Sequence, residues 1–441
     1  MNRGLIAVIV LVLSLMLLAG CNPPPEQGTT PPPAPGAKAK PPEGTTFTQQ
    51  GDTIKIGLNV ELTGDTATFG QSTQKGVDLA VEELNNGGGL LGRKVEIVAE
   101  DNKGKGTDSA TVAKKLIEVD KVAALLGSVA STNSMGMAAI AEDKKIPMVT
   151  PASTNPKVTV ENDKLKRYVF RTCFIDDFQG DAIAIYCKSD LKASRIAILY
   201  DNGQDYSKGV RERVAKKFTE LGGVVAVEGT YTKDDQDFRA KLTQIKAKQF
   251  DVLVLPGYYT QAAQIIKQAR ELGITTPIIG GDGLDSDELI KIGGKDVEGV
   301  YFTNHYSVED KDPRVQAFVA KFKAKYGQTP DAMGVLGYDA ANVLFDAIKQ
   351  AGTTDPEKIT DAIAATKGFP GVTGDITIDQ NHNAVKKLVV LQIKDGKRHM
   401  VKAILPGGAK ALPAEKDKSS STQSSRDDEV KGKTGDKKTG L

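Results

Sequence analysis

Short apolar runs alternate with amphipathic segments through the middle of the chain. The runs at 54–60 and 195–200 are rich in Ile, Leu and Val, as strands of a buried sheet are. Each run is followed by a segment, at 71–84 and at 210–221, in which apolar residues recur with helical spacing. Strands that alternate with single helices form parallel βαβ units with right-handed crossovers. The pattern therefore predicts an α/β fold.

The alternation runs once through the first part of the chain and starts again at 195, which indicates two separate sheets. The other elements are expected as strands at 95–99, 122–126, 147–150, 224–227, 251–255, 277–280 and 387–393, and as helices at 110–119, 134–143, 238–247, 262–272, 313–326, 332–351 and 356–365. The last of these strands is expected in a hairpin at a sheet edge.

Each series of strands and helices can bury a core of its own. The sequence therefore predicts two doubly wound, Rossmann-like lobes joined by a multi-strand hinge. We place lobe 1 at 52–173 and 305–378, and lobe 2 at 174–304 and 379–406.

The first residues have the pattern of a secretory signal. Arg3 precedes an apolar run, Leu5 to Leu18, that is too short to span a bilayer comfortably. We therefore expect 1–20 to be a signal peptide, and Leu18-Ala19-Gly20-Cys21 looks like a bacterial lipobox whose cysteine is acylated. The alternative is an ordinary secretory signal in which Cys21 is incidental. Acylation would hold the protein at the extracytoplasmic face of a bacterial membrane, in the periplasm or at the cell surface.

Both flanks of the folded region are too polar to build a core. The stretch 21–51 is crowded with Pro, Gly, Thr and Lys, which favour extended conformers, and we expect it to be a tether. The stretch 407–441 consists mostly of Lys, Asp, Ser, Thr and Gly, and we expect a disordered tail.

Charge and motif content exclude several classes of function. The chain has 58 Lys and Arg against 56 Asp and Glu, without a basic stripe that alternates with aromatics, which argues against nucleic-acid binding. His305, His382 and His399 are widely spaced, so we expect no metal site and assign them to the surface or the hinge. No nucleophile elbow or glycine-rich dinucleotide motif is present. We therefore expect no catalytic residue, no enzyme activity and no cofactor.

The two cysteines after Cys21 do not suggest a disulfide framework. Cys173 and Cys187 could form one bridge in an oxidising compartment. Because Cys187 lies on the apolar face of a predicted helix, two separate buried thiols are favoured.

Polar clusters follow the strands of both predicted sheets, where open α/β sheets bind ligands. Hydroxyl-rich segments at 130–134 and 150–156 follow strands of the first lobe, and 256–260 and 280–283 follow strands of the second. A helix that starts in the first of these offers backbone N–H groups and the positive end of its dipole to an anion. Together the clusters predict a cage for a zwitterion.

Two of the clusters also have a purely structural interpretation. Ser131 or Thr132 could simply cap the following helix. Asp282, with glycine on both sides, could be a turn residue.

These clusters, together with other segments, carry a family resemblance over about 53–404. The region resembles the branched-chain amino-acid-binding (Leu/Ile/Val-binding) proteins of bacterial ABC importers, which are type I periplasmic binding proteins. The matching pieces are Leu62-Thr63-Gly64, Phe69-Gly70, 127–131, 150–156, Arg171-Thr172, 176–180 and 257–259.

The resemblance implies how an amino acid would be held. Ser131, the Thr154 amide and Tyr258 are expected to bind the ligand carboxylate. The Ala152 carbonyl, the Thr154 hydroxyl and Asp282 are expected to bind its ammonium group.

The same resemblance implies that Phe69 and Tyr206 shape the side-chain pocket, and Ser153 and Asp176 complete the expected ligand-binding set. Many family members have a larger aromatic residue at the position of Phe69 and a glutamate at that of Asp282. The first difference alters the size of the pocket, and the second shortens the carboxylate.

By this resemblance the protein is expected to be a monomeric receptor that captures an L-amino acid, branched-chain or related, and delivers it to an ABC permease. A sensory or regulatory module that binds amides, urea or other small solutes is the alternative. A secreted enzyme is a third alternative, and it would require turnover of a substrate. The residues leave the identity of the ligand open.

Overall fold

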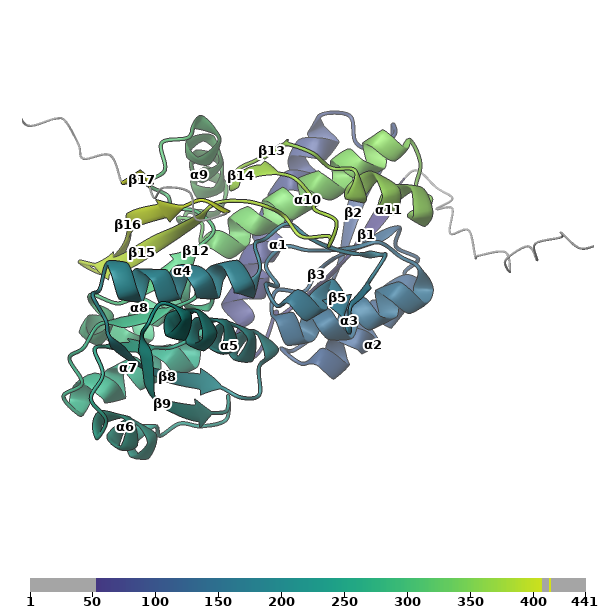
Figure 1. Ribbon diagram of the computed structural model, residues 1–441. Helices are drawn as coiled ribbons and strands as arrows, with labels where there is room; N and C mark the ends of the chain where they lie inside the picture. Colours follow the sequence, from purple (N-terminus) through teal and green to yellow (C-terminus); the bar gives the residue numbers. More distant parts are fainter. Residues whose placement is uncertain (1–52, 407–411, 414–441) are drawn as a thin grey trace, which may run out of the picture. The chain divides into compact units, whose positions relative to one another are not determined.

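The structure, a computed structural model, describes residues 53–406 and 412–413 (Figure 1). The expected signal peptide, Cys21 and the expected tether lie outside the described residues. So does nearly all of the expected tail.

A parallel sheet forms the core of the first lobe. Five consecutive residues of its first strand, Ile56 to Val60, are buried, as expected for a strand covered on both faces. The strand order is β2 (Lys94–Asp101), β1 (Thr53–Val60), β3 (Ala124–Gly127), β4 (Met148–Thr150) and β7 (Val169–Arg171). The connecting elements are α1 (Ala67–Asn86), α2 (Gly106–Glu118), α3 (Ser131–Lys144), the 3-10 turn η1 (Pro156–Val158) and a small hairpin of β5 (Val160–Glu161) and β6 (Lys164–Leu165).

A second, mixed sheet forms the core of the other lobe. Its parallel part has the order β9 (Val224–Tyr231), β8 (Arg195–Asp201), β10 (Val252–Val254), β11 (Ile278–Gly280) and β12 (Tyr301–Asn304). Beyond β12 lie the antiparallel strands β15 (Leu388–Lys394), β16 (Lys397–Ile404) and β17 (Leu412–Pro413). Helices and 3-10 turns connect these strands: α4 (Asp176–Ser189), α5 (Asp205–Glu220), α6 (Arg239–Lys246), α7 (Tyr259–Glu271), η2 (Asp282–Leu284), α8 (Asp287–Gly293) and η3 (Gly294–Val297).

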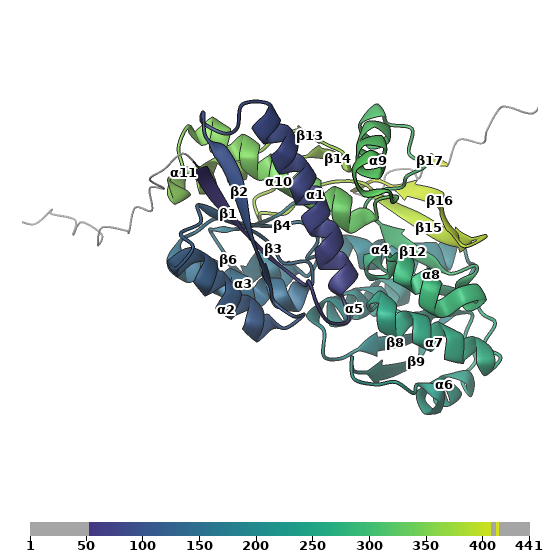
Figure 2. The ribbon, with the colours of Figure 1, turned by 180° about the vertical axis from the view of Figure 1, so that it is seen from behind.

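The third group of elements packs on the first lobe (Figure 2). It contains α9 (Pro313–Tyr326), α10 (Ala332–Ala351), α11 (Pro356–Ala364) and the hairpin of β13 (Phe369–Gly371) and β14 (Gly374–Ile376). The backbones of α1 and α10 touch, because a Cβ atom on Gly76 would lie 1.9 Å from the Gly334 carbonyl oxygen. The glycines therefore permit this close helix packing.

These sheets confirm the predicted α/β fold with two Rossmann-like lobes. The chain passes between the sheets after β7, after β12 and before β15, which gives the expected multi-strand hinge. Cys173 and Cys187 are buried and free, so the prediction of separate thiols is confirmed. One correction concerns the tail: Leu412–Pro413 pairs with β16 as a short strand, because the edge of that sheet offers backbone partners.

Both sheets have the same switch in strand order. In the first, β1 lies between β2 and β3, and in the second β8 lies between β9 and β10. At such a point the following connections turn to opposite faces and leave a crevice at the carboxyl ends of the strands, where α/β proteins bind ligands. The polar clusters found in the sequence follow these ends.

Candidate functional site

A small cavity lies between the carboxyl ends of the two sheets. Residues from both lobes line it: Phe69, Val129, Ser131, Ala152, Tyr206, Tyr258, Asp282, Gly283 and Met333. Most of the expected ligand-binding residues are therefore brought together. Ser153, Thr154 and Asp176 are not among the lining residues.

Ser131 begins α3, but it does not cap the helix. Ala130 is the N-cap residue, and no side chain at that position bonds to the first turn. The Ser131 hydroxyl oxygen instead accepts a hydrogen bond from the Asn155 backbone N–H, at 3.2 Å. A hydroxyl can donate while it accepts, so the Ser131 O–H remains available at the cavity wall.

The capping interpretation is also wrong for Thr132, because its side chain bonds to the other lobe. The Thr132 hydroxyl donates to the Asp205 carboxylate at 3.0 Å and accepts from the Asp205 backbone N–H at 3.1 Å. Thr132 therefore joins the lobes beside the cavity.

A buried acid occupies part of the N-terminus of α3. Glu61 follows β1 directly and accepts hydrogen bonds from the backbone N–H groups of Val129 and Ala130 and from the Asn133 side chain. Burial raises the pKa of Glu61 above its ordinary value, and the hydrogen bond from Asn133 opposes this shift. The helix end thus already has a carboxyl partner. The sequence signal for it is an acid at the carboxyl end of a buried strand.

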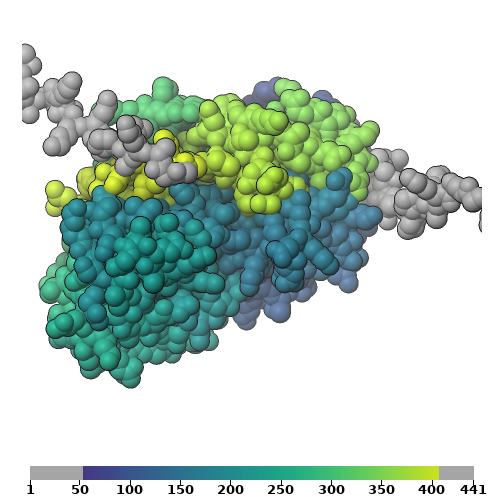
Figure 3. All heavy atoms as spheres, in the orientation of Figure 1, coloured from purple at the N-terminus to yellow at the C-terminus, as the bar shows by residue number. Residues whose placement is uncertain are grey.

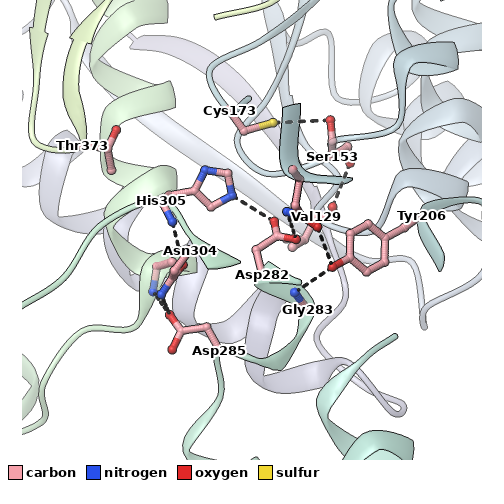
Figure 4. Close-up of polar contacts among 12 residues, drawn as sticks. Val129, Ser153, Cys173, Tyr206, Asp282, Gly283, Asp285, Asn304, His305 and Thr373 are labelled. Carbon is pink, nitrogen blue, oxygen red and sulfur yellow. Dashed lines mark hydrogen bonds and ion pairs between the residues drawn. The ribbon is translucent and has the colours of Figure 1, made fainter. Parts of the chain in front are cut away.

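The hydroxyls of the turn after β4 differ in how they are used. Ser153 donates to the Val129 carbonyl at 2.8 Å and lies 2.6 Å from the Ser134 hydroxyl, so it ties this turn to the one after β3 (Figure 4). The Thr154 hydroxyl is buried and faces the Asp176 carboxyl without a hydrogen bond of ordinary geometry to it. Since buried polar groups are rarely left unpaired, the Thr154 hydroxyl is the one in this turn that is available to form a hydrogen bond with a ligand.

Asp176 lies beside Thr154 at the start of α4. Its backbone N–H donates to the Thr154 carbonyl at 2.9 Å, and both of its carboxylate oxygens are buried without a hydrogen-bond partner among the described residues. Burial raises the pKa of Asp176 well above its ordinary value. The group therefore adds a second acid next to the cavity.

The second lobe places Asp282 in a ring of donors. The Gln179 side-chain N–H₂ donates to one carboxylate oxygen at 2.8 Å, and Nε2 of His305 lies 2.9 Å from the other (Figure 4). The Tyr206 hydroxyl donates to the Gln179 oxygen at 3.2 Å and accepts from the Gly283 N–H at 3.1 Å. The Asp282 carboxylate is therefore held by side chains that lie outside its own turn.

Aromatic rings from both lobes surround the remaining cavity wall. Phe69 of the first lobe meets Tyr258 of the second edge-on, with ring centroids 6.0 Å apart. Tyr258 stacks on Tyr206 at 5.2 Å. Burial raises the pKa of both tyrosines well above the ordinary value, so both phenols are neutral donors at neutral pH. This arrangement makes an apolar pocket with polar groups at one end.

The lobes contact each other directly around the cavity. Hydrogen bonds join Thr68 to Ser286 at 3.0 Å, the Thr260 hydroxyl to the Asp65 carbonyl at 2.8 Å, and the Asn155 side chain to the Asp205 carbonyl at 2.8 Å. In the space-filling view the blue segments of the first lobe touch the teal segments of the second (Figure 3). The structure therefore has the closed arrangement of the two lobes.

Three residues that contact the site through others were outside the expected set. Glu61 bonds to the turn that carries Ser131, while Gln179 and His305 bond to Asp282. The histidine assignments fit the structure: His305 and His382 are buried at the hinge, and His399 is on the surface with 42% of its side chain exposed. Within 53–406, no cluster of three or more His, Cys, Asp or Glu side chains could hold a metal ion.

Comparison with known proteins gives a consistent result. The chain is 31% identical over 335 residues to a protein of Pseudomonas aeruginosa named as a leucine-, isoleucine-, valine-, threonine- and alanine-binding protein, covering 76% of this chain and 88% of the relative. A crystal structure of a leucine-binding protein, LivK, of Thermotoga maritima superposes with a TM-score of 0.76 at 43% identity, covering 80% of this chain and 99% of that one.

A second solved structure contains a ligand. It is the branched-chain amino-acid transporter substrate-binding protein LivJ of Streptococcus pneumoniae in complex with isoleucine, with a TM-score of 0.75, 34% identity, and coverage of 82% of this chain and 99% of that one. The sequence model of the family described as periplasmic binding protein matches residues 53–398, which include the first sheet, most of the second and the residues that line the cavity. The chain therefore belongs to the periplasmic binding protein family.

Proposed function

We propose that this protein is the extracytoplasmic solute-binding receptor of an ABC importer and that it captures an L-amino acid, branched-chain or related, in the cavity between the lobes. The observation that carries the proposal is the chemistry of the two walls. The Ser131 hydroxyl lines the cavity from the first lobe, and the Asp282 carboxyl and the phenols of Tyr206 and Tyr258 line it from the second. Such a pair of walls complements a small zwitterion.

The ligand carboxylate is assigned to Ser131, the Thr154 amide and Tyr258. The free O–H of Ser131 and the neutral phenol of Tyr258 are donors at the cavity wall. Hydrogen bonds to a charged group contribute about 1.5–3 kcal/mol each, so a few such donors can hold a buried carboxylate.

The ligand ammonium group is assigned to the Ala152 carbonyl, the Thr154 hydroxyl and Asp282. The unpartnered Thr154 hydroxyl gains a partner when the ammonium binds, which removes the cost of leaving it unpaired. Asp282 supplies the compensating charge.

Ligand binding and lobe closure are coupled in this proposal. A ligand held by Ser131 and Asp282 at once contacts both lobes, so it binds the closed arrangement more tightly than an open one and shifts the equilibrium toward it. The hydrogen bonds between the lobes add to the stability of that state. The permease is the partner that would recognise the closed form.

The membrane attachment is proposed from the sequence. Acylation of Cys21 would anchor the receptor, with 21–51 as the tether. In the part of the chain that the structure describes, every helix is too short or too polar to span a bilayer. A Cys21→Ala protein is expected in the soluble fraction with unchanged ligand affinity. Continued partition with membranes would contradict the anchor.

Calorimetry with a matched set of ligands tests the proposed function. Leucine carries both charges, 4-methylpentanoate lacks the ammonium group, and 3-methylbutylamine lacks the carboxylate. Leucine is expected to bind at least about 100-fold more tightly than either analogue, because each analogue leaves one wall unpaired. Equal binding of all three, or binding of urea and short amides alone, would instead support a sensory module for neutral solutes.

A further inference from the structure

Asp282 has a partner on each carboxylate oxygen, and the two partners come from different parts of the fold. Gln179 lies on α4, and His305 follows β12 where the chain leaves the second sheet for the hinge. Since Asp282 is 3% exposed, these side chains decide where its carboxylate points. Neither of them lines the cavity.

His305 is held by contacts of its ring and of its backbone. The ring stacks on Phe174, with centroids 3.8 Å apart and planes inclined by 15°. Phe174 lies in the other hinge segment, between β7 and α4. The backbone N–H of His305 donates to the Asn304 side chain at 2.8 Å, and the Asn304 amide donates to Asp285 at 2.9 Å (Figure 4). Asn304 and His305, which are adjacent in the chain, thus bond to the two ends of the loop from Asp282 to Asp285.

The proton on the His305 ring can be assigned from its surroundings. Nδ1 is buried without a hydrogen-bond partner among the described residues, whereas Nε2 lies 2.9 Å from the carboxylate, so the neutral ring carries its proton on Nε2 and donates to Asp282. Asp282, Asp285 and Lys386 are the charged groups that face the ring. Burial lowers the pKa of His305 below its ordinary value of 6.5, and the hydrogen bond with Asp282 opposes this shift.

We propose that His305 is a positioning residue that aims the Asp282 carboxylate at the ligand's ammonium group and ties it to the hinge through the stack on Phe174. This inference rests on the proposed function. It assigns the two hydrogen bonds to Asp282 different roles: Gln179 holds the carboxylate within the second lobe, and His305 connects it to the segment that moves on closure.

The proposal has a consequence for the pH dependence of binding. A protonated His305 would form an ion pair with Asp282 and compete with the ligand ammonium for its charge, so the ligand favours the neutral ring. Binding then requires the ring to lose its proton. Affinity is therefore full above the pKa of His305 in the ligand-free protein and falls as the pH drops through it. Because this pKa lies below 6.5, the fall is expected in the acidic range, by up to about tenfold per pH unit.

Two substitutions separate the hydrogen bond from the stack. His305→Gln keeps an N–H₂ donor for Asp282 but cannot be protonated. His305→Phe keeps a ring against Phe174 but has no donor. We expect His305→Gln to bind leucine within about fivefold of the wild type at pH 7.5 and to lose part of the acidic fall in affinity. We expect His305→Phe to bind at least about tenfold more weakly, with 4-methylpentanoate unaffected.

His382 offers a matched control. Its ring also stacks on a phenylalanine at the hinge, Phe170, with centroids 4.0 Å apart, and its Nδ1 lies 3.0 Å from the Val169 carbonyl. Burial lowers its pKa as well. Because His382 does not contact Asp282, His382→Gln is expected to keep the affinity of the wild type and its pH profile.

The outcomes distinguish the inference from the function on which it rests. A wild type that does not bind leucine more tightly than 4-methylpentanoate contradicts the proposed function. A wild type that does, combined with a His305→Phe protein of unchanged affinity or a His305→Gln protein with an unchanged pH profile, contradicts the role of His305.

A measurement without ligand tests the geometry directly. In ¹⁵N NMR spectra of the ligand-free protein, with His305 assigned by its absence from the His305→Gln spectrum, the ring is expected to be neutral at pH 7 and protonated on Nε2. A ring that is charged at pH 7, or protonated on Nδ1, would overturn the inference.

Discussion

The two walls of the cavity are polar in different ways. In the first lobe, hydroxyls at the strand ends mostly bond to one another and to backbone carbonyls: Thr150 donates to Ser128 at 2.6 Å and Ser153 to Val129 at 2.8 Å. What remains for a ligand is the Ser131 O–H and the unpartnered Thr154 hydroxyl. In the second lobe, one carboxylate is held by two neutral donors.

From this difference we expect the two walls to contribute unequally to binding. The first wall supplies several neutral groups that bind the ligand, so the others partly compensate for the loss of one. The second wall supplies the charge at a single residue, Asp282. Substitutions in the second wall should therefore cost more affinity than substitutions in the first.

The largest effect is expected for Asp282→Asn. The amide keeps the shape but removes the charge opposite the ligand ammonium, and breaking a buried ion pair costs about 3–5 kcal/mol. Leucine affinity should fall by roughly 100-fold to 4,000-fold. Calorimetry gives this number, and small-angle scattering should show that leucine no longer compacts the variant. Affinity for 4-methylpentanoate, which has no ammonium, should not fall. A variant that binds leucine like the wild type would return Asp282 to the role of a turn residue.

A smaller effect is expected for Ser131→Ala. The substitution removes one donor to the ligand carboxylate while the Thr154 amide and Tyr258 remain, so leucine affinity should fall about tenfold to 100-fold. Unlike the change at Asp282, it should weaken 4-methylpentanoate to the same extent, because both ligands carry the carboxylate. Full affinity for both would remove Ser131 from the carboxylate site.

The smallest effect on affinity, with an opposite effect on stability, is expected for Thr154→Val. Removal of the hydroxyl should weaken leucine about fivefold to tenfold, since the Ala152 carbonyl and Asp282 still face the ammonium. The ligand-free protein should become more stable by about 1 kcal/mol, because a buried unpartnered hydroxyl is replaced by a methyl group. Denaturant unfolding without ligand measures this change.

Thr150→Val is the control for that prediction. Thr150 lies in the same turn and is fully buried, but its hydroxyl is paired with the Ser128 carbonyl. Its loss should lower the free energy of unfolding, because the carbonyl loses a donor. If both variants shift stability in the same direction, Thr154 has a partner in the folded protein.

Local sequence signals were sufficient for some elements and not for others. The bounds of α9 and α10 were predicted as observed, because Asp312 and Asp331 cap their first turns and Gly327 and Gly352 end them with positive φ. The start of α5 was predicted at 210 and lies at Asp205, since the first turn of that helix has no apolar periodicity.

The site was predictable where it depends on strand ends and not where it depends on contacts between distant segments. Ser131, Ala152, Tyr258 and Asp282 follow strands, so the fold brings them together. Glu61 and His305 act through hydrogen bonds to residues about 70 and 23 positions away, respectively. No local pattern encodes such pairings, because they depend on how the turns and hinge segments pack.

The most direct test of the account is a crystal structure of the protein with leucine bound. We predict that the ligand carboxylate lies within hydrogen-bond distance, about 2.7–3.2 Å, of the Ser131 hydroxyl and the Thr154 amide. The ligand ammonium group is expected within the same distance of the Asp282 carboxylate. An ammonium that points away from Asp282, or leucine bound outside the cavity, would contradict it.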